Sequence, residues 1–216
     1  MVDDSSPALE RGPDVDRIVF FSDAIFAIAM TLLAISLRLP LDTKDSDVAH
    51  ELHNTIPSIY AYMLSFAVIG VYWLAHHRMF HFIRAFDGTM IVLNLATLGV
   101  VAFVPFPTTV LGDHGKTTAG VVFYATTIGL LGLAMESTWM YAARGYRLIR
   151  SDTSAEYLRY SMLRGMVPPA VFFASIPIAF ASPSAAEVFW ILILVANIIL
   201  RRRYGSTYRH LVGPRG

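Results

Sequence analysis

Residues 18–39 read IVFFSDAIFAIAMTLLAISLRL, and only Asp23 and Arg38 are charged within these 22 residues. A helix needs roughly 20 predominantly apolar residues to cross the hydrocarbon core of a bilayer, which is about 30 Å thick. The run is therefore predicted to span a membrane. The stretch before it has no basic n-region and no small-residue cleavage site, so we expect this helix to be retained rather than removed as a signal peptide.

Five further stretches have a similar length and composition. Their predicted boundaries are residues 57–75, 90–111, 118–143, 163–181 and 185–200. The fifth stretch contains Pro168, Pro169 and Pro177, which remove backbone hydrogen bonds and kink membrane helices, yet it is predicted as one span. The chain is 55% hydrophobic and 15% charged, whereas a soluble domain carries about 25% charged residues.

These features predict an all-α membrane protein built as one six-helix bundle. The bundle is expected to cover residues 18–200, between an N-terminal tail over residues 1–17 and a basic tail over residues 201–216. Residues 144–164 are interpreted as a connector that lies on the surface. The surrounding partner is then the lipid bilayer, and a net charge of +1 gives no indication of nucleic-acid binding.

Basic residues are distributed unequally between the two predicted sides. Among the 17 Lys and Arg residues, all except Arg38, Lys44 and Lys116 fall in the two tails or in the segments after the second and fourth spans. Short loops rich in Lys and Arg remain in the cytoplasm. Both termini are therefore expected to be cytoplasmic, and the run 201–203 is interpreted as a flank of the last span.

The sequence offers little for catalysis or cofactor binding. It contains no cysteine, no H-E-x-x-H, no G-x-S-x-G and no glycine-rich phosphate loop. His77 and His81 are spaced i, i+4, but no third metal ligand accompanies them, so no metal site is predicted. The chain is therefore not expected to be an enzyme. It also lacks a T-V-G-Y-G filter, so side chains would have to select any permeating ion.

Several polar residues fall at a similar depth near the predicted cytoplasmic surface. They come from four spans and are Ser22, Asp23, His76, His77, Asn94 and Glu136. Polar groups inside a membrane usually face the bundle interior or a water-filled path, because lipid cannot satisfy them. Two interpretations stay open at this point: a hydrogen-bonded clamp between helices, or part of an ion or proton path.

Residues 17–23 read RIVFFSD and fit the pattern R-x-x-x-F-S-D at the start of the first helix. This pattern resembles the signature of the transmembrane protein 175 family, the endolysosomal potassium channels and their bacterial relatives. Trp73, His76, His77, Asn94 and the sequence PFP at 105–107 add to the resemblance. One six-helix unit is similar to the bacterial form, a homotetramer, whereas the animal proteins carry two units and dimerise. The resemblance implies potassium as the permeant ion, a bacterial plasma membrane and no cofactor.

The resemblance also implies roles along the first helix, which lines the pore in that family. Ile28 is expected at a bulky constriction and Thr31 at a hydroxyl linked to selectivity, with Ile35 one turn further and Leu32 beside them. Independently of the family, the spacing i, i+3, i+7 places Ile28, Thr31 and Ile35 on one helix face. The expected structural residues around the motif are Arg17, Phe21, Ser22, Asp23, Trp73, His76, His77 and Asn94.

Two rival hypotheses differ from a channel in measurable ways. A proton-coupled secondary transporter would use Asp23, His77 and Glu136 and would give saturable flux driven by pH. A non-conducting scaffold would use the polar layer only to stiffen the bundle and would give no flux.

Overall fold

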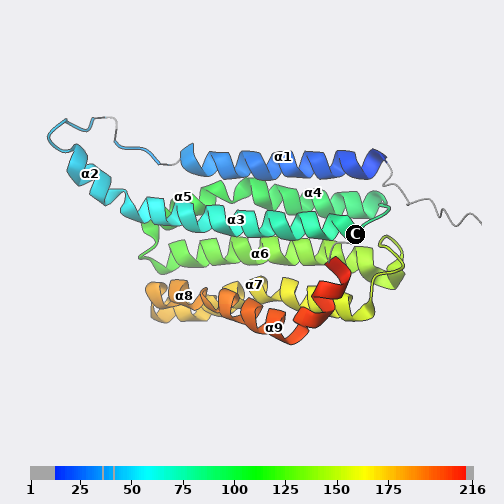
Figure 1. The fold of residues 1–216 in the computed structure, drawn as a ribbon. Coiled ribbons are helices and arrows are strands. Elements are labelled where there is room, and N and C mark those ends of the chain that lie inside the picture. The colour runs from blue at the N-terminus through cyan, green and yellow to red at the C-terminus, as the bar shows by residue number, and fades with distance from the viewer. Residues whose placement is uncertain (1–12, 36, 41, 213–216) are drawn as a thin grey trace, which may run out of the picture.

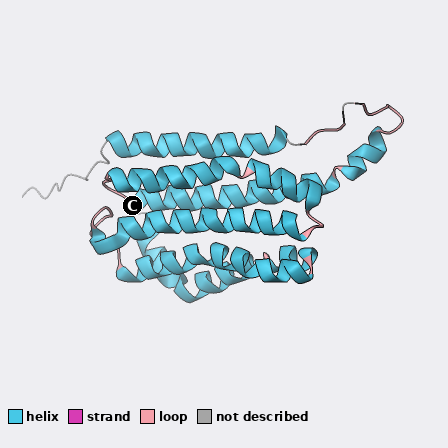
Figure 2. Ribbon diagram, turned by 180° about the vertical axis from the view of Figure 1, so that it is seen from behind, coloured by secondary structure: helices cyan, strands magenta, loops and turns pink. Residues whose placement is uncertain are grey.

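The computed structural model describes residues 13–35, 37–40 and 42–212, and within them the chain is helical (Figures 1 and 2). The elements in chain order are α1 (Pro13–Ile35), α2 (Val48–Asn54), α3 (Ile56–Phe82), α4 (Gly88–Phe103), α5 (Pro105–His114), α6 (Thr118–Ala143), the 3-10 turn η1 (Arg144–Tyr146), α7 (Ala155–Ala181), α8 (Pro183–Phe189) and α9 (Leu192–Val212). In this part of the chain, extended pairing is limited to one isolated bridge between Ile83 and Ile149.

Six helical stretches are long and apolar enough to cross a membrane, which confirms the predicted all-α architecture. They cover Val15–Ile35, Ile56–Phe82, Gly88–His114, Thr118–Tyr146, Ala155–Ala181 and Pro183–Tyr204. The third combines α4 with α5, and the sixth combines α8 with α9. Because the count is even, α1 begins and α9 ends at the same end of the bundle (Figure 1), which is called the terminal end below.

Helix ends differ from the predicted boundaries where local hydrogen bonding decides them. The first span was expected to reach Leu39, but α1 ends at Ile35, where Arg38 Nε donates to the Ile35 carbonyl at 2.8 Å. This bond satisfies one of the carbonyls that a helix end leaves unpaired. The second span was expected to end at residue 75, but α3 continues to Phe82.

Proline and serine residues account for the other differences. The third span is divided at Val104, because Pro105 supplies no N–H and begins α5. The fifth was expected from residue 163, but α7 begins at Ala155, where the Ser154 hydroxyl accepts the N–H of Tyr157. The connector after α6 is therefore shorter than the predicted 144–164. The sixth span is divided between α8 and α9 and extends beyond residue 200.

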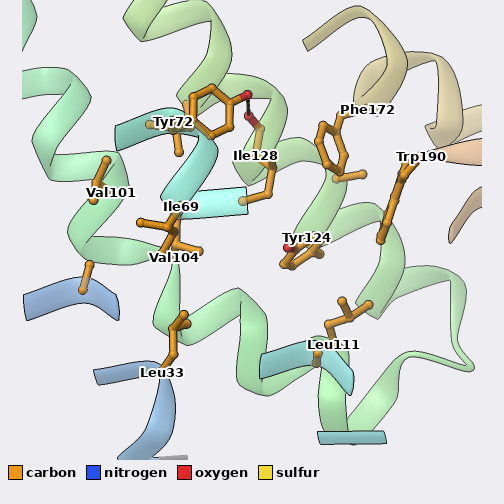
Figure 3. Packing of buried hydrophobic residues seen from close by; sticks show 14 of the residues in the cluster. Leu33, Ile69, Tyr72, Val101, Val104, Leu111, Tyr124, Ile128, Phe172 and Trp190 are labelled. Carbon is orange, nitrogen blue, oxygen red and sulfur yellow. Dashed lines mark hydrogen bonds between the residues drawn. The ribbon is translucent and has the colours of Figure 1, made fainter. Parts of the chain in front are cut away.

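The helices form layers with α6 between the two outer groups. On one side α4 and α5 contact α6, and α1 packs on α3 and α4; on the other side α7 packs along α6 and carries α8 and α9 (Figure 1). The main core surrounds α6, where Tyr124 and Ile128 meet Ile69, Phe172 and Trp190 (Figure 3). The α1 helix therefore lies at the edge of the bundle, with one face left uncovered.

Candidate functional site

The α1 helix has a buried stripe and an exposed stripe. The buried side chains recur every three or four residues, as a single helix face requires, and they are Val15, Val19, Ser22, Phe26, Ala29 and Leu33. This stripe packs on α3 and α4 and fixes the rotation of α1 about its own axis. The remaining side of the helix faces away from the protein.

The exposed stripe carries the side chains predicted to line a pore. Ile28 and Ile35 are each 53% exposed and Leu32 is 40% exposed. Thr31 lies on the same exposed face, and its hydroxyl donates to the Ile28 carbonyl at 2.8 Å. With its proton given to the backbone, the Thr31 oxygen keeps lone pairs that can accept or coordinate. The structure thus places these four residues together.

A chain of hydrogen bonds connects the buried side of α1 to α4 and α3. Asn94 on α4 donates its Nδ2 to Ser22 Oγ at 3.1 Å, and its Oδ1 lies 2.9 Å from His76 Nε2 on α3. Ser22 donates in turn to the Ile18 carbonyl at 2.8 Å. Ser22 and His76 are 0% exposed and Asn94 is 3% exposed. This Ser22–Asn94–His76 network holds three helices in register.

The protonation of His76 follows from its partner. An amide oxygen can only accept, so His76 Nε2 carries the proton and donates to Asn94, and in neutral His76 the other ring nitrogen, Nδ1, is an acceptor. Nδ1 has no partner among the described residues. The ring stacks on Phe80 at 4.4 Å between centroids and lies 5.4 Å from Phe26. An imidazole held by a hydrogen bond and by ring stacking suits a structural contact.

Asp23 has a different partner from its neighbour Ser22. Trp73 on α3 donates its indole N–H to Asp23 Oδ1 at 2.8 Å. His77 is exposed and lies over Trp73 with centroids 5.9 Å apart. The structure therefore brings Asp23, Trp73 and His77 together beside the Ser22–Asn94–His76 network.

Three predicted residues lie apart from these contacts. Arg17 and Phe21 are exposed, and both line a cavity of about 420 Å³ between α1 and α4, bordered also by Ile18, Phe86, Ile91, Asn94 and Leu95. Glu136 is 5% exposed, but its carboxylate packs against Gly165 of α7. Glu136 was expected at the depth of Asn94; its carboxylate points between α6 and α7, away from the Ser22–Asn94–His76 network.

Two polar clusters were missed by the sequence reasoning. Ser65 of α3 lies 3.0 Å from the Tyr124 hydroxyl and 2.8 Å from Thr108 Oγ1, which connects α3, α5 and α6. Hydroxyl residues within apolar spans are the signal that would have indicated this cluster. The second cluster centres on Asp87, whose spacing from its partners along the chain gives no such signal.

Asp87 joins the α3–α4 loop to the segment after α6. Its carboxylate accepts the Tyr141 hydroxyl at 2.7 Å, the N–H of Met90 at 2.9 Å, and Arg147 at 2.8 Å. These donors lower the pKa of Asp87, the Tyr141 hydrogen bond most of all. The nearby Ile83–Ile149 bridge adds backbone pairing between the same two segments. Together they tie the α1–α4 side of the bundle to the α6–α7 side.

Comparison with known proteins gives relatives along most of the chain. The family model described as endosomal/lysosomal potassium channel TMEM175 matches residues 17–105. A potassium channel of Streptomyces collinus is 30% identical over 193 residues, covering 88% of this chain and 90% of that protein. The human endosomal/lysosomal proton channel TMEM175 is 24% identical over 169 residues, covering 74% of this chain and 33% of that protein.

The fold is also similar to a solved structure. The crystal structure of a lysosomal potassium-selective channel TMEM175 homologue from Chamaesiphon minutus is matched with a TM-score of 0.75 and 26% sequence identity, over 88% of this chain and 99% of that one. Sequence similarity along nearly all of a bacterial relative and a matching fold lead to one conclusion. The chain is a multi-pass membrane protein and belongs to the TMEM175 family.

Proposed function

We propose that this protein is a potassium-selective cation channel in which four copies of the chain surround one axis, with their α1 helices lining the pore. The observation that carries the proposal is the uncovered face of α1, where Ile28, Thr31, Leu32 and Ile35 face away from their own subunit. The relatives named as potassium channels, and the fold match to one described as potassium-selective, support the choice of ion.

The gate would be hydrophobic. Rings of Ile28, Leu32 and Ile35 from four subunits would narrow the pore with side chains that cannot hydrogen-bond water. A narrow apolar constriction closes a channel by dewetting, so a small outward displacement of the α1 helices would open it. The hydrogen bonds of Ser22 with Asn94 and of Asp23 with Trp73 would hold the helices during that movement.

Selectivity would come from a ring of Thr31 hydroxyls. Each Thr31 donates its proton to the Ile28 carbonyl, so its oxygen is free to face a cation. Four such oxygens would replace part of an ion's hydration shell, and potassium holds that shell less tightly than sodium does. A single ring of side-chain oxygens offers fewer ligands than a long carbonyl filter, so the expected discrimination is modest.

The orientation and the membrane belong to the proposal. The terminal end of the bundle carries most of the Lys and Arg residues, so the positive-inside rule supports a cytoplasmic position for both termini. A single six-helix unit of the bacterial kind supports a plasma membrane. No cofactor and no enzymatic activity are proposed.

A proton-coupled transporter is not favoured. It would require Asp23, His77 and Glu136 to exchange a proton. Asp23 and His77 share Trp73 as a neighbour on the α3 side, whereas Glu136 packs against α7. No hydrogen bond between the described residues connects Glu136 with the other two.

The decisive experiment measures ion flux through purified protein in liposomes, with matched potassium and sodium gradients. Wild type should give non-saturating flux that prefers potassium, and Thr31→Ala should reduce that preference while flux persists. Thr31→Ser keeps the hydroxyl and serves as the matched control, with selectivity close to wild type. Saturable flux that requires a pH gradient would favour the transporter, and folded protein without flux would favour the scaffold.

A further inference from the structure

The α7 and α9 helices meet along a seam with two defined contacts. Arg164 of α7 donates its Nε to Asn197 Oδ1 of α9 at 3.1 Å, and Asn197 Nδ2 donates to the Ile193 carbonyl at 2.8 Å. Nearer the end of both helices, the rings of Tyr160 and Tyr204 lie 5.5 Å apart. Neither contact belongs to the proposed pore or to its polar network.

Helical spacing places a second arginine between these two contacts. Arg201 follows Asn197 by four residues and precedes Tyr204 by three, so all three share one face of α9. That face is turned toward Arg164 and Tyr160 of α7 by the contacts themselves. Arg201 is exposed, and neither it nor Arg164 pairs with an acidic side chain in the described part of the chain. Two guanidinium groups therefore lie along the same seam without a counter-charge.

The surface above the seam is apolar. Exposed fractions are 43% for Leu163 on α7, and 65% for Leu194 and 54% for Ile198 on α9. The α9 helix packs on α7 at the outside of the bundle (Figure 1), so this surface faces lipid. An acyl chain has the chemistry to cover it.

The depth of the seam fits a lipid headgroup. The apolar part of α9 ends at Leu200 and is followed by three arginines, so Arg201 lies where the helix changes from apolar to basic. The α7 helix has 27 residues and is therefore about 40 Å long at 1.5 Å per residue, which exceeds the ~30 Å hydrocarbon core. The long side chain of Arg164 can therefore extend to the interface. The Tyr160–Tyr204 pair stands where membrane proteins place aromatic residues, at the boundary with water.

We propose that the Arg164–Arg201 seam is a binding site for an anionic phospholipid of the leaflet at the terminal end. The lipid phosphate would accept hydrogen bonds from the guanidinium groups of Arg164 and Arg201, and an acyl chain would lie along Leu194 and Ile198. Arginine suits this task because its fork of N–H donors matches two phosphate oxygens. The lipid would also bridge α7 and α9, which adds to the contact between the two helices.

The neighbouring arginines provide an internal comparison. At 3.6 residues per turn, Arg202 and Arg203 are rotated by about 100° and 200° from Arg201 around α9, so they do not share its position at the seam. Diffuse attraction between a basic surface and anionic lipid would depend equally on all three residues. Binding of a lipid at a defined site depends on Arg201 and Arg164 instead.

The test uses the full-length protein in an uncharged detergent and measures the rise of its thermal unfolding midpoint as lipid is added. The probes are dioleoylphosphatidylglycerol, dioleoylphosphatidylcholine and glycerol 3-phosphate. Phosphatidylglycerol should raise the midpoint more than phosphatidylcholine at equal concentration. Arg201→Gln should weaken the apparent affinity about fivefold, as expected for one arginine at a lipid phosphate. Arg202→Gln is the matched control and should remain within twofold of wild type.

A second variant tests the role of the Arg164 guanidinium at the seam. Arg164→Lys keeps the charge but loses the fork, so it should weaken phosphatidylglycerol binding, whereas Arg201→Gln leaves the Arg164–Asn197 bond in place. Equal losses in Arg201→Gln and Arg202→Gln would overturn the proposal in favour of diffuse charge. An equal response to glycerol 3-phosphate would overturn it in favour of a soluble anion. Equal responses to the two lipids would leave no role for the headgroup charge and would also overturn it.

Discussion

Replacement of Asn94 by Leu tests whether the buried Ser22–Asn94–His76 network stabilises the bundle. The variant removes the acceptor of His76 Nε2, in a site that is 0% exposed and enclosed by Phe26 and Phe80. A buried donor without a partner costs about 1–3 kcal/mol. Asn94→Leu also removes the hydrogen bond from Asn94 to Ser22. Ser22 keeps its own bond to the Ile18 carbonyl, so this second loss adds little to the cost. We expect Asn94→Leu to lower the free energy of unfolding by about 1–3 kcal/mol.

A double-mutant cycle isolates the contact between Asn94 and His76. His76→Phe alone leaves the Asn94 oxygen unpaired, whereas the double variant removes both polar groups. The double variant should therefore cost less than the sum of the single variants. Hydrogen bonds inside membrane proteins average about 0.6 kcal/mol in such cycles and reach about 1.7. We expect a value in the upper part of this range, because His76 is 0% and Asn94 is 3% exposed, which limits replacement of their hydrogen bond by water. Unfolding in mixed detergent micelles gives the required free energies.

The matched control is the Thr97–Thr138 pair between α4 and α6. These hydroxyls lie 3.4 Å apart, and each already lies within hydrogen-bond distance of a carbonyl one turn earlier in its own helix. A cycle with Thr97→Val and Thr138→Val should show additivity within about 0.5 kcal/mol. The reasoning about the network is refuted when the Asn94–His76 coupling is no larger than this control value.

Three further predictions concern packing, pH and the gate. Gly132→Ala should destabilise the protein by about 1–3 kcal/mol in the same unfolding assay, because its Cβ would lie 2.8 Å from Cδ of the rigid Pro169 ring. Gly99→Ala, with open space around it, should be neutral or stabilising by up to about 1 kcal/mol, and an equally neutral Gly132→Ala would contradict the packing. The folded-state pKa of Asp87 is lowered, so its contribution is present above the unfolded pKa near 3.9 and is lost as pH falls through the folded pKa. The difference in thermal midpoint between wild type and Asp87→Asn should hold constant from pH 8 to pH 5 and decrease below about pH 4; a difference that does not decrease at all between pH 5 and pH 2 would show that the charge is irrelevant. Ile28→Asn should raise liposome flux at rest by allowing water into the constriction, and unchanged flux would argue against a gate at this position.

Part of the candidate site followed from helical periodicity alone. Ile28, Thr31 and Ile35 share a face in any α-helix, and in the structure this face is exposed. Composition could not show which face of α1 is uncovered, because apolar residues occur on both its buried and its exposed face. Only the packing of Phe26 and Leu33 against α3 and α4 identifies the face that turns inward.

Other features depended on contacts between distant parts of the chain. Asn94 is 72 residues from Ser22 and 18 from His76, and no local pattern pairs them. Glu136 was grouped with these residues by its depth along the membrane, which is set by its place in the sequence. Its direction around α6 decides its partner, and that direction leads to Gly165 of α7.

The sequence by itself determined the all-α class, the six spans and the stripe on α1, because a bilayer imposes a fixed length of apolar helix and the helix imposes a fixed period. The tertiary structure decided which helices touch, where each helix ends and which polar groups meet. Lipid is as apolar as a leucine side chain, so hydrophobicity drives helices into the membrane but does not select their neighbours there. That selection depends on shape and on hydrogen bonds such as those of Asn94, which exist only once the helices are side by side.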